Sequence, residues 1–137
     1  MCLSEIETLK RLRKHRADRA ERGLLEAKRL QRALQAQIGQ AGDALEQTRE
    51  QEARQSAQLL SQHQGQVLSL QQLKSWSAEE HSLSADTRRE EEQLHELHGQ
   101  RQTCVINVEQ AQQQVTRCLR QVEKLRELSV LLAQEDT

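Results

Sequence analysis

Glu91, His95 and His98 belong to residue types that can bind metal ions, and they follow one another at spacings of four and three residues. On one helix this spacing places them on neighbouring faces, where they could serve as ligands. Carboxylate-bridged metal centres in helical bundles, however, take their ligands from several helices that enclose the ion. The pattern described below predicts only a pair of helices. We therefore interpret these side chains as solvated and expect no metal ion and no other cofactor.

The three cysteines, Cys2, Cys104 and Cys118, form no CxxC pair and no disulfide framework, which is typical of reduced thiols. On one helix, with a rise of about 1.5 Å per residue, Cys104 and Cys118 would lie about 21 Å apart, beyond disulfide reach. Neither has an activating base in its expected neighbourhood, so we interpret both as small core residues. The chain also lacks a P-loop, a GxGxxG motif and a catalytic triad pattern, and we expect no enzymatic activity.

The composition favours long helices over a globular domain. The 137 residues include no Pro, Phe or Tyr and a single Trp, and charged residues make up 30% of the chain. Aromatic side chains supply the largest buried areas of compact cores, whereas Ala, Leu, Glu, Gln, Lys and Arg lose least in a helix. Disorder is the competing interpretation, but disordered chains lack sustained apolar periodicity.

Two heptad seams indicate helices that wrap around each other. Core positions recur in alternating steps of four and three from Ala20 to Leu59 and again from Leu94 to Leu132. We predict an all-α fold of two long helices in an antiparallel coiled-coil hairpin. Its core would include Leu24, Leu34, Ile38, Leu45, Leu94, Leu97, Val108, Val115, Val122 and Leu125.

The single hairpin of residues 1–137 is predicted to have its first helix at about 3–74, a bend at about 75–86 and its second helix at about 87–134. Ser77 and Glu80 in this bend fit the S-x-x-E capping box, in which each side chain satisfies a free backbone N–H at a helix start. Apolar residues from Leu60 to Leu73 follow a shifted phase, which we interpret as a stutter within the first helix. Three glycines of that helix, Gly39, Gly42 and Gly65, would soften it without ending it.

The register follows from the bend. A bend near Trp76 pairs Glu52 with Arg101, whereas a bend near Glu80 leaves Arg101 facing Leu59. We prefer the first register, because an unpaired charge in a seam is costly. It leaves roughly the first fifteen residues as a single projecting basic helix, an estimate that rests on the heptad pairing.

Charge is unevenly distributed in a chain of net charge −1. Residues 1–32 carry ten Lys and Arg against five acidic residues, and residues 78–100 carry seven acidic residues against two Arg. The basic run fits a solvated helix face, an acidic protein partner, or a polyanion such as nucleic acid or an anionic membrane. The near absence of aromatics argues against stacking on single strands, and we expect no nucleic acid partner.

Trp76, the single aromatic residue, falls at the predicted bend with Leu70, Leu73 and Leu83 around it. Trp is common among interface anchors, so these four residues are candidates for a partner contact. No apolar run is long enough to cross a bilayer, and the basic N-terminal residues are not followed by a signal-peptide core. We expect no transmembrane segment and a cytoplasmic location.

The chain opens with a spaced set of Leu, Ile, Arg and Ala residues that ends in a Glu: Leu3, Ile6, Leu9, Arg11, Leu12, Arg13, Arg16, Ala17, Arg19, Ala20 and Glu21. These residues resemble the start of the type III secretion stalk proteins of the YscO and FliJ kind. It implies a non-enzymatic central stalk, peripheral at the inner-membrane face of the secretion apparatus. Such a stalk inserts into the hexameric secretion ATPase, contacts the cytoplasmic ring of the export gate and binds export chaperones.

The resemblance also implies where the contacts lie. Candidate ATPase contacts are Arg11, Arg13, Lys14, Arg16, Arg19 and Arg22, and candidate export-gate or partner contacts at the bend are Leu70, Leu73, Trp76 and Leu83. We expect a monomer when the protein is alone. The alternatives are a dimeric coiled-coil adaptor or scaffold and, third, a basic helical binder of nucleic acid or membrane surfaces.

Overall fold

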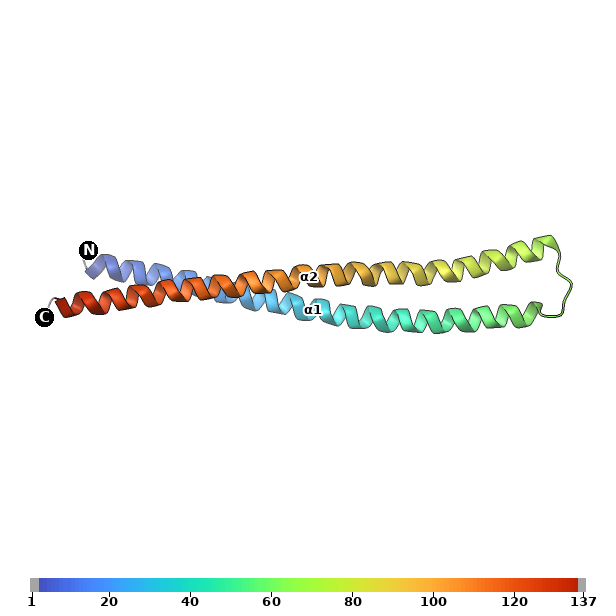
Figure 1. Ribbon diagram of the computed structural model, residues 1–137, viewed down its shortest axis with the longest axis horizontal. Helices are drawn as coiled ribbons and strands as arrows, with labels where there is room; N and C mark the ends of the chain where they lie inside the picture. The colour runs from blue at the N-terminus through green and yellow to red at the C-terminus, as the bar shows by residue number, and fades with distance from the viewer. Residues whose placement is uncertain (1–2, 136–137) are drawn as a thin grey trace. The chain divides into compact units, whose positions relative to one another are not determined.

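Two long helices form the structure, a computed structural model that describes residues 3–135. They are α1 (Leu3–His63, 61 residues) and α2 (Leu70–Glu135, 66 residues), joined by residues 64–69 (Figure 1). No strand occurs in this range. The helices pack against each other, so the predicted all-α antiparallel hairpin is confirmed. The helices persist because the chain has no Pro and is rich in good helix formers.

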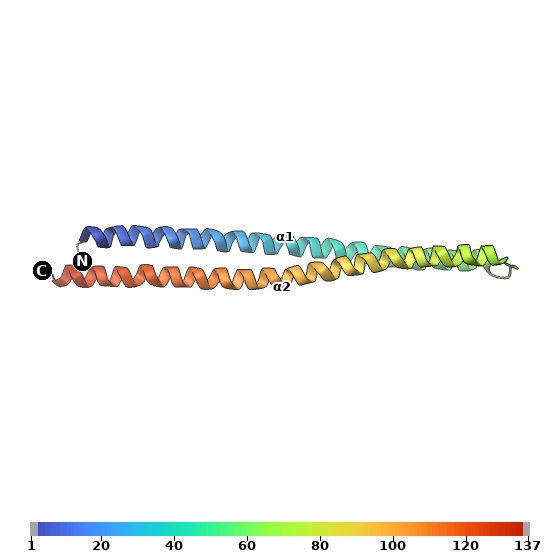
Figure 2. The same ribbon diagram turned by 90° about the horizontal axis from the view of Figure 1, so that it is seen from above.

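The chain divides into two compact units, and each helix contributes a segment to both. Within the described residues, unit 1 consists of 3–33 with 101–135, and unit 2 consists of 34–100. In each unit the α1 segment runs along the α2 segment: those of unit 1 are seen next to each other in Figure 2 and cross in Figure 1, and those of unit 2 are seen next to each other in Figure 1 and overlap in Figure 2.

The turn of unit 2 begins just after α1 ends at His63, and Gly65 is its second residue. Gly65 has a φ of 77°, in the left-handed region that residues with a Cβ rarely adopt, and the N–H of Gln66 donates to the carbonyl of His63 at 3.3 Å. The expectation that Gly65 lies inside the first helix is therefore wrong. The shifted phase of the leucines after Leu59 is also explained, because Leu60 is exposed and the chain then leaves the helix.

A reciprocal cap at Ser69 and Gln72 starts α2. The N–H of Gln72 donates to Oγ of Ser69 at 3.2 Å, and the N–H of Ser69 donates to Oε1 of Gln72 at 2.9 Å. The predicted bend at 75–86 is wrong, since those residues are helical and Ser77 and Glu80 lie inside α2. Ser69 and Ser77 fit the same capping motif. The cap forms at Ser69 because Gly65, four residues earlier, turns the chain with its left-handed backbone.

In unit 1 the seam is mostly aliphatic. Ile6 is fully buried, and Ala17, Cys118 and Leu125 are 4%, 5% and 3% exposed. The predicted core residues Leu24, Val108, Val115 and Val122 are half-buried. A hydrogen bond of 2.7 Å from Nη1 of Arg13 to the carbonyl of Gln121 joins the two helix segments. The first fifteen residues are therefore paired with α2, and the predicted projecting single helix is wrong because its register depended on the wrong bend.

In unit 2 the seam changes character along its length. Leu34 and Leu45 are buried, and Ile38, Leu94 and Leu97 are half-buried. Beyond Leu45 the seam becomes polar. A carboxylate oxygen of Glu52 accepts a hydrogen bond from the hydroxyl of Thr87, which is 8% exposed.

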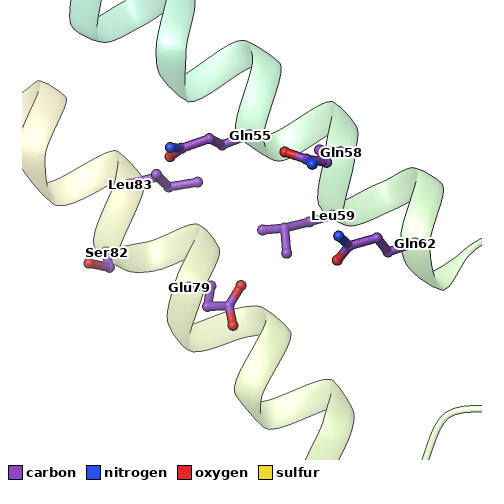
Figure 3. Close-up of a pocket in the computed structure, with 7 residues that line it drawn as sticks. All are labelled: Gln55, Gln58, Leu59, Gln62, Glu79, Ser82 and Leu83. Carbon is purple, nitrogen blue, oxygen red and sulfur yellow. The ribbon is translucent and has the colours of Figure 1, made fainter.

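Both predicted registers are wrong. Glu52 is paired with Thr87, and the side chain of Arg101 is exposed. Leu59 lies across a groove from Glu79 and Leu83 (Figure 3). The two registers failed together because each was built from a bend placed inside α2.

Candidate partner-binding surfaces

The Glu and His side chains with metal-binding chemistry lie on the surface of α2. Glu91, His95 and His98 are exposed, and Oε1 of Glu91 accepts a hydrogen bond from Nη2 of Arg49 at 2.9 Å. Across residues 3–135, no three His, Cys, Asp or Glu side chains come together as a metal site. Over the same range, neither helix has a segment of the length and hydropathy needed to cross a membrane.

The cysteines are placed as follows. Cys118 is buried in the unit 1 seam, where its sulfur lies 3.7 Å from Nε2 of Gln114. Cys104 is half-buried. The expectation for Cys2 lies outside the described residues. The two thiols of α2 thus occupy packing positions.

The predicted basic contact residues lie on α1 in unit 1. Arg11, Lys14, Arg16, Arg19 and Arg22 are exposed. The sixth residue, Arg13, is half-buried and donates to Gln121 across the seam, so its guanidinium holds the helices together. The five exposed cations therefore remain the candidates for a contact with a partner.

Unit 1 also has exposed cations on α2 that are not among the predicted contact residues. Arg117, Arg120 and Lys124 are exposed on the segment that lies against α1 in unit 1. A surface groove lined by Arg16 and Arg19 of α1 also includes residues 118 and 121 of α2, which directly follow Arg117 and Arg120 in the sequence. A second groove runs along Arg117 and Arg120. Arg117, Arg120 and Lys124 lie within two residues of seam positions of α2, so the correct pairing of the two helices would have placed them in the same unit as the basic run of α1.

We define the basic surface as Arg11, Lys14, Arg16, Arg19, Arg22, Arg117, Arg120 and Lys124. Within the described part of the chain, none of these eight side chains forms an ion pair, whereas Lys10 lies 3.6 Å from Glu7 and Arg126 lies 3.9 Å from Glu123. Exposed cations that form no ion pair attract anionic surfaces over about one Debye length, about 8 Å at physiological salt.

The two units carry opposite charge. The described residues of unit 1 include fifteen Lys and Arg and nine Asp and Glu, a net charge of +6. Unit 2 includes five Lys and Arg and eleven Asp and Glu, a net charge of −6. One partner surface cannot complement both, so the units suit partners of different charge.

The predicted contact residues at the bend divide into two groups in unit 2. Leu70 and Leu73 are 69% and 46% exposed in the first turns of α2, and Val67 of the turn is fully exposed. We call Val67, Leu70 and Leu73 the apolar tip. These side chains gather at one turn, and an exposed apolar group of this kind marks interaction sites.

Trp76 and Leu83 belong instead to the seam. The rings of Trp76 and His63 lie with centroids 4.9 Å apart at 31°, and Nε1 of Trp76 donates to Oε1 of Glu80 at 3.3 Å. Leu83 points toward α1, beside Leu59, in a groove that is otherwise lined by polar side chains (Figure 3). Both are half-buried, so they are less accessible to a partner than the apolar tip.

Comparison with known proteins gives one family. A family model described as "Type III secretion protein YscO" matches residues 6–137, which include parts of both units. No curated protein and no solved structure matches the chain. The match confirms the resemblance carried by the opening residues.

Proposed function

Because the chain belongs to the YscO family of type III secretion proteins, we propose that it is the central stalk of the apparatus, coupling the hexameric secretion ATPase to the export gate and to export chaperones. In this role the protein transforms no substrate itself. Hydrolysis of ATP belongs to the ATPase, and the stalk acts through its contacts. It would work at the cytoplasmic face of the inner membrane, held there by its partners.

The observation that carries the ATPase contact is the basic surface of unit 1, whose eight exposed cations come from both helices and have no acidic partner in the described chain. A single stalk inside a ring of six subunits cannot match every subunit at once. Long, charged side chains suit this situation, because they reach acidic groups at varying distances without close steric fit. Unit 1 is therefore our candidate for the part within the ring.

The export gate and the chaperones are assigned to unit 2. Two features of unit 2 support this assignment. The side chains of the apolar tip, Val67, Leu70 and Leu73, are exposed, and the net charge of unit 2 is opposite in sign to that of unit 1. Trp76 and Leu83 remain candidates for this contact as well. A partner of unit 2 would thus bury apolar side chains and need not compete with the ATPase.

The test uses the full-length protein with its cognate secretion ATPase. We expect the protein to bind the ATPase ring and to stimulate ATP hydrolysis, with both effects weakening as salt is raised, since the contact is largely ionic. Mass measurement in solution should give a monomer for the free protein. Binding to anionic vesicles or duplex DNA, together with no ring binding and no stimulation, would replace the stalk proposal with the polyanion-binding alternative.

A further inference from the structure

The part of unit 2 nearest the turn, residues 48–90, has an unusual seam. We call this segment the polar tip section. Its ten seam positions are buried or half-buried, and only Leu59, Trp76 and Leu83 among them are apolar. The others are Thr48, Glu52, Gln55, His63, Glu80, Thr87 and Glu90. The seam of unit 1 differs. Between residues 17 and 31 and between residues 104 and 125, every seam position is Ala, Leu, Val or Cys except Gln31.

Three carboxylates of the polar tip section are held inside this seam. Glu52 accepts from the hydroxyl of Thr87. Both oxygens of Glu80 accept from Oγ of Ser56, at 2.9 and 3.0 Å, and Oε1 also accepts from Trp76. Oε2 of Glu90 is buried and has no hydrogen-bond partner among residues 3–135. The contacts of Glu52 with Thr87 and of Ser56 with Glu80 join α1 to α2 and specify how the helices align, because a shift of either helix would break them.

These contacts give alignment but little net stability. A hydrogen bond within a protein replaces one with water, so its net contribution is small, and a carboxylate oxygen buried without a partner opposes folding. An aliphatic seam gains from every side chain that it removes from water. The section is bounded by Leu45, which is 5% exposed, and by Leu94, where the aliphatic seam resumes.

We propose that the polar tip section is a built-in conformational device that opens as one cooperative segment while the aliphatic seam of unit 1 stays closed. In the open state the carboxylates of Glu52, Glu80 and Glu90 return to water. Leu59, Leu83 and Trp76 are then uncovered and add apolar area to the exposed apolar tip. The inference goes beyond the stalk role, and its test uses the protein alone.

Hydrogen–deuterium exchange on the full-length protein tests the opening directly. We expect amides of residues 50–62 and 76–88 to exchange at least about tenfold faster than those of residues 17–31 and 108–125, and with one common degree of protection. Fraying from the turn would instead give exchange that falls gradually with distance from residues 64–69. Such a gradient, or equal protection of the two sets, would overturn the proposal.

A variant pair shows whether the carboxylates are the cause. Glu52→Leu with Glu90→Leu should slow exchange in the polar tip section by about tenfold or more and leave residues 17–31 unchanged. The control, Glu46→Leu with Glu92→Leu, removes two exposed carboxylates from the same unit and should leave exchange as in the wild type. Equal effects of the two pairs, or no effect of the first, would refute the proposal.

Trp76 provides an independent readout, because it is the single Trp of the chain. Thr87→Ala leaves the carboxylate of Glu52 without its donor and should raise both the exchange of residues 50–62 and the quenching of Trp76 fluorescence by acrylamide. Glu52→Leu with Glu90→Leu should lower the quenching. If quenching stays constant across these variants while the helix content is unchanged, the section does not open in the proposed way.

Discussion

Arg13 and Gln121 lie on opposite helices of unit 1, and the guanidinium of Arg13 donates to the backbone carbonyl of Gln121 at 2.7 Å. Charge-assisted hydrogen bonds are stronger than neutral ones, although partial exposure weakens them. We expect Arg13→Ala to lower the free energy of unfolding by about 1 kcal/mol, measured by urea denaturation followed by circular dichroism.

Arg11→Ala is the control for this prediction, since Arg11 is exposed and forms no ion pair within the described residues. It should change the stability by less than about 0.5 kcal/mol. If the two variants were equally stable, the contact between Arg13 and Gln121 would have no role in joining the helices.

The turn makes opposite predictions for two glycines. Gly65 has a positive φ, so Gly65→Ala should destabilise the protein by about 1 kcal/mol through backbone strain, although open space surrounds the new Cβ. Gly39 lies inside α1, also with open space around a Cβ, and Gly39→Ala should stabilise the protein by up to about 1 kcal/mol. Thermal unfolding of the two variants should therefore shift in opposite directions, and a shared sign would contradict the turn geometry.

The helices and most of the seam could be predicted, because a heptad repeat is a local pattern that needs no knowledge of the partner. The positions from Ala20 to Leu59 are buried or half-buried as the repeat requires, and those from Leu94 to Leu132 follow with Arg101 as the exposed exception. The same repeat runs through Trp76, Glu80 and Thr87. An apolar periodicity does not reveal it there, because most seam residues of the polar tip section are polar.

The turn could not be placed, because Ser69 with Gln72 and Ser77 with Glu80 offer the same capping chemistry. The feature that decides is the left-handed backbone of Gly65, and in sequence this glycine looks like Gly39 and Gly42. Because the position of the turn fixes the register of an antiparallel hairpin, a misplaced turn makes every predicted pair of residues across the two helices wrong. For that reason neither predicted register brings Arg117, Arg120 and Lys124 opposite the α1 cations of the basic surface, with which they share unit 1.

The α2 cations give a test of the basic surface that leaves the N-terminal run intact. Arg117→Glu with Arg120→Glu should weaken binding to the secretion ATPase by at least about tenfold and abolish stimulation, because two attractions become repulsions. Lys74→Glu with Arg88→Glu makes the same charge change at exposed positions of unit 2 and should leave ATPase binding unchanged. Circular dichroism checks that both variants remain helical. Equal loss in both pairs would show a net-charge effect and not a contact surface.

The apolar tip predicts a loss of binding that is separate from the ATPase contact. Leu70→Ser with Leu73→Ser removes two exposed leucines next to the turn and should reduce binding to the isolated cytoplasmic ring of the export gate by about tenfold or more, since each buried leucine contributes about 1.5 kcal/mol or more. Stimulation of the ATPase should be retained, because unit 1 is unchanged. The matched control is Leu25→Ser with Leu30→Ser, which alters leucines of unit 1 that are 63% and 55% exposed. Gate binding that survives the first pair, or that falls equally with the control, would remove the apolar tip from the proposed contact.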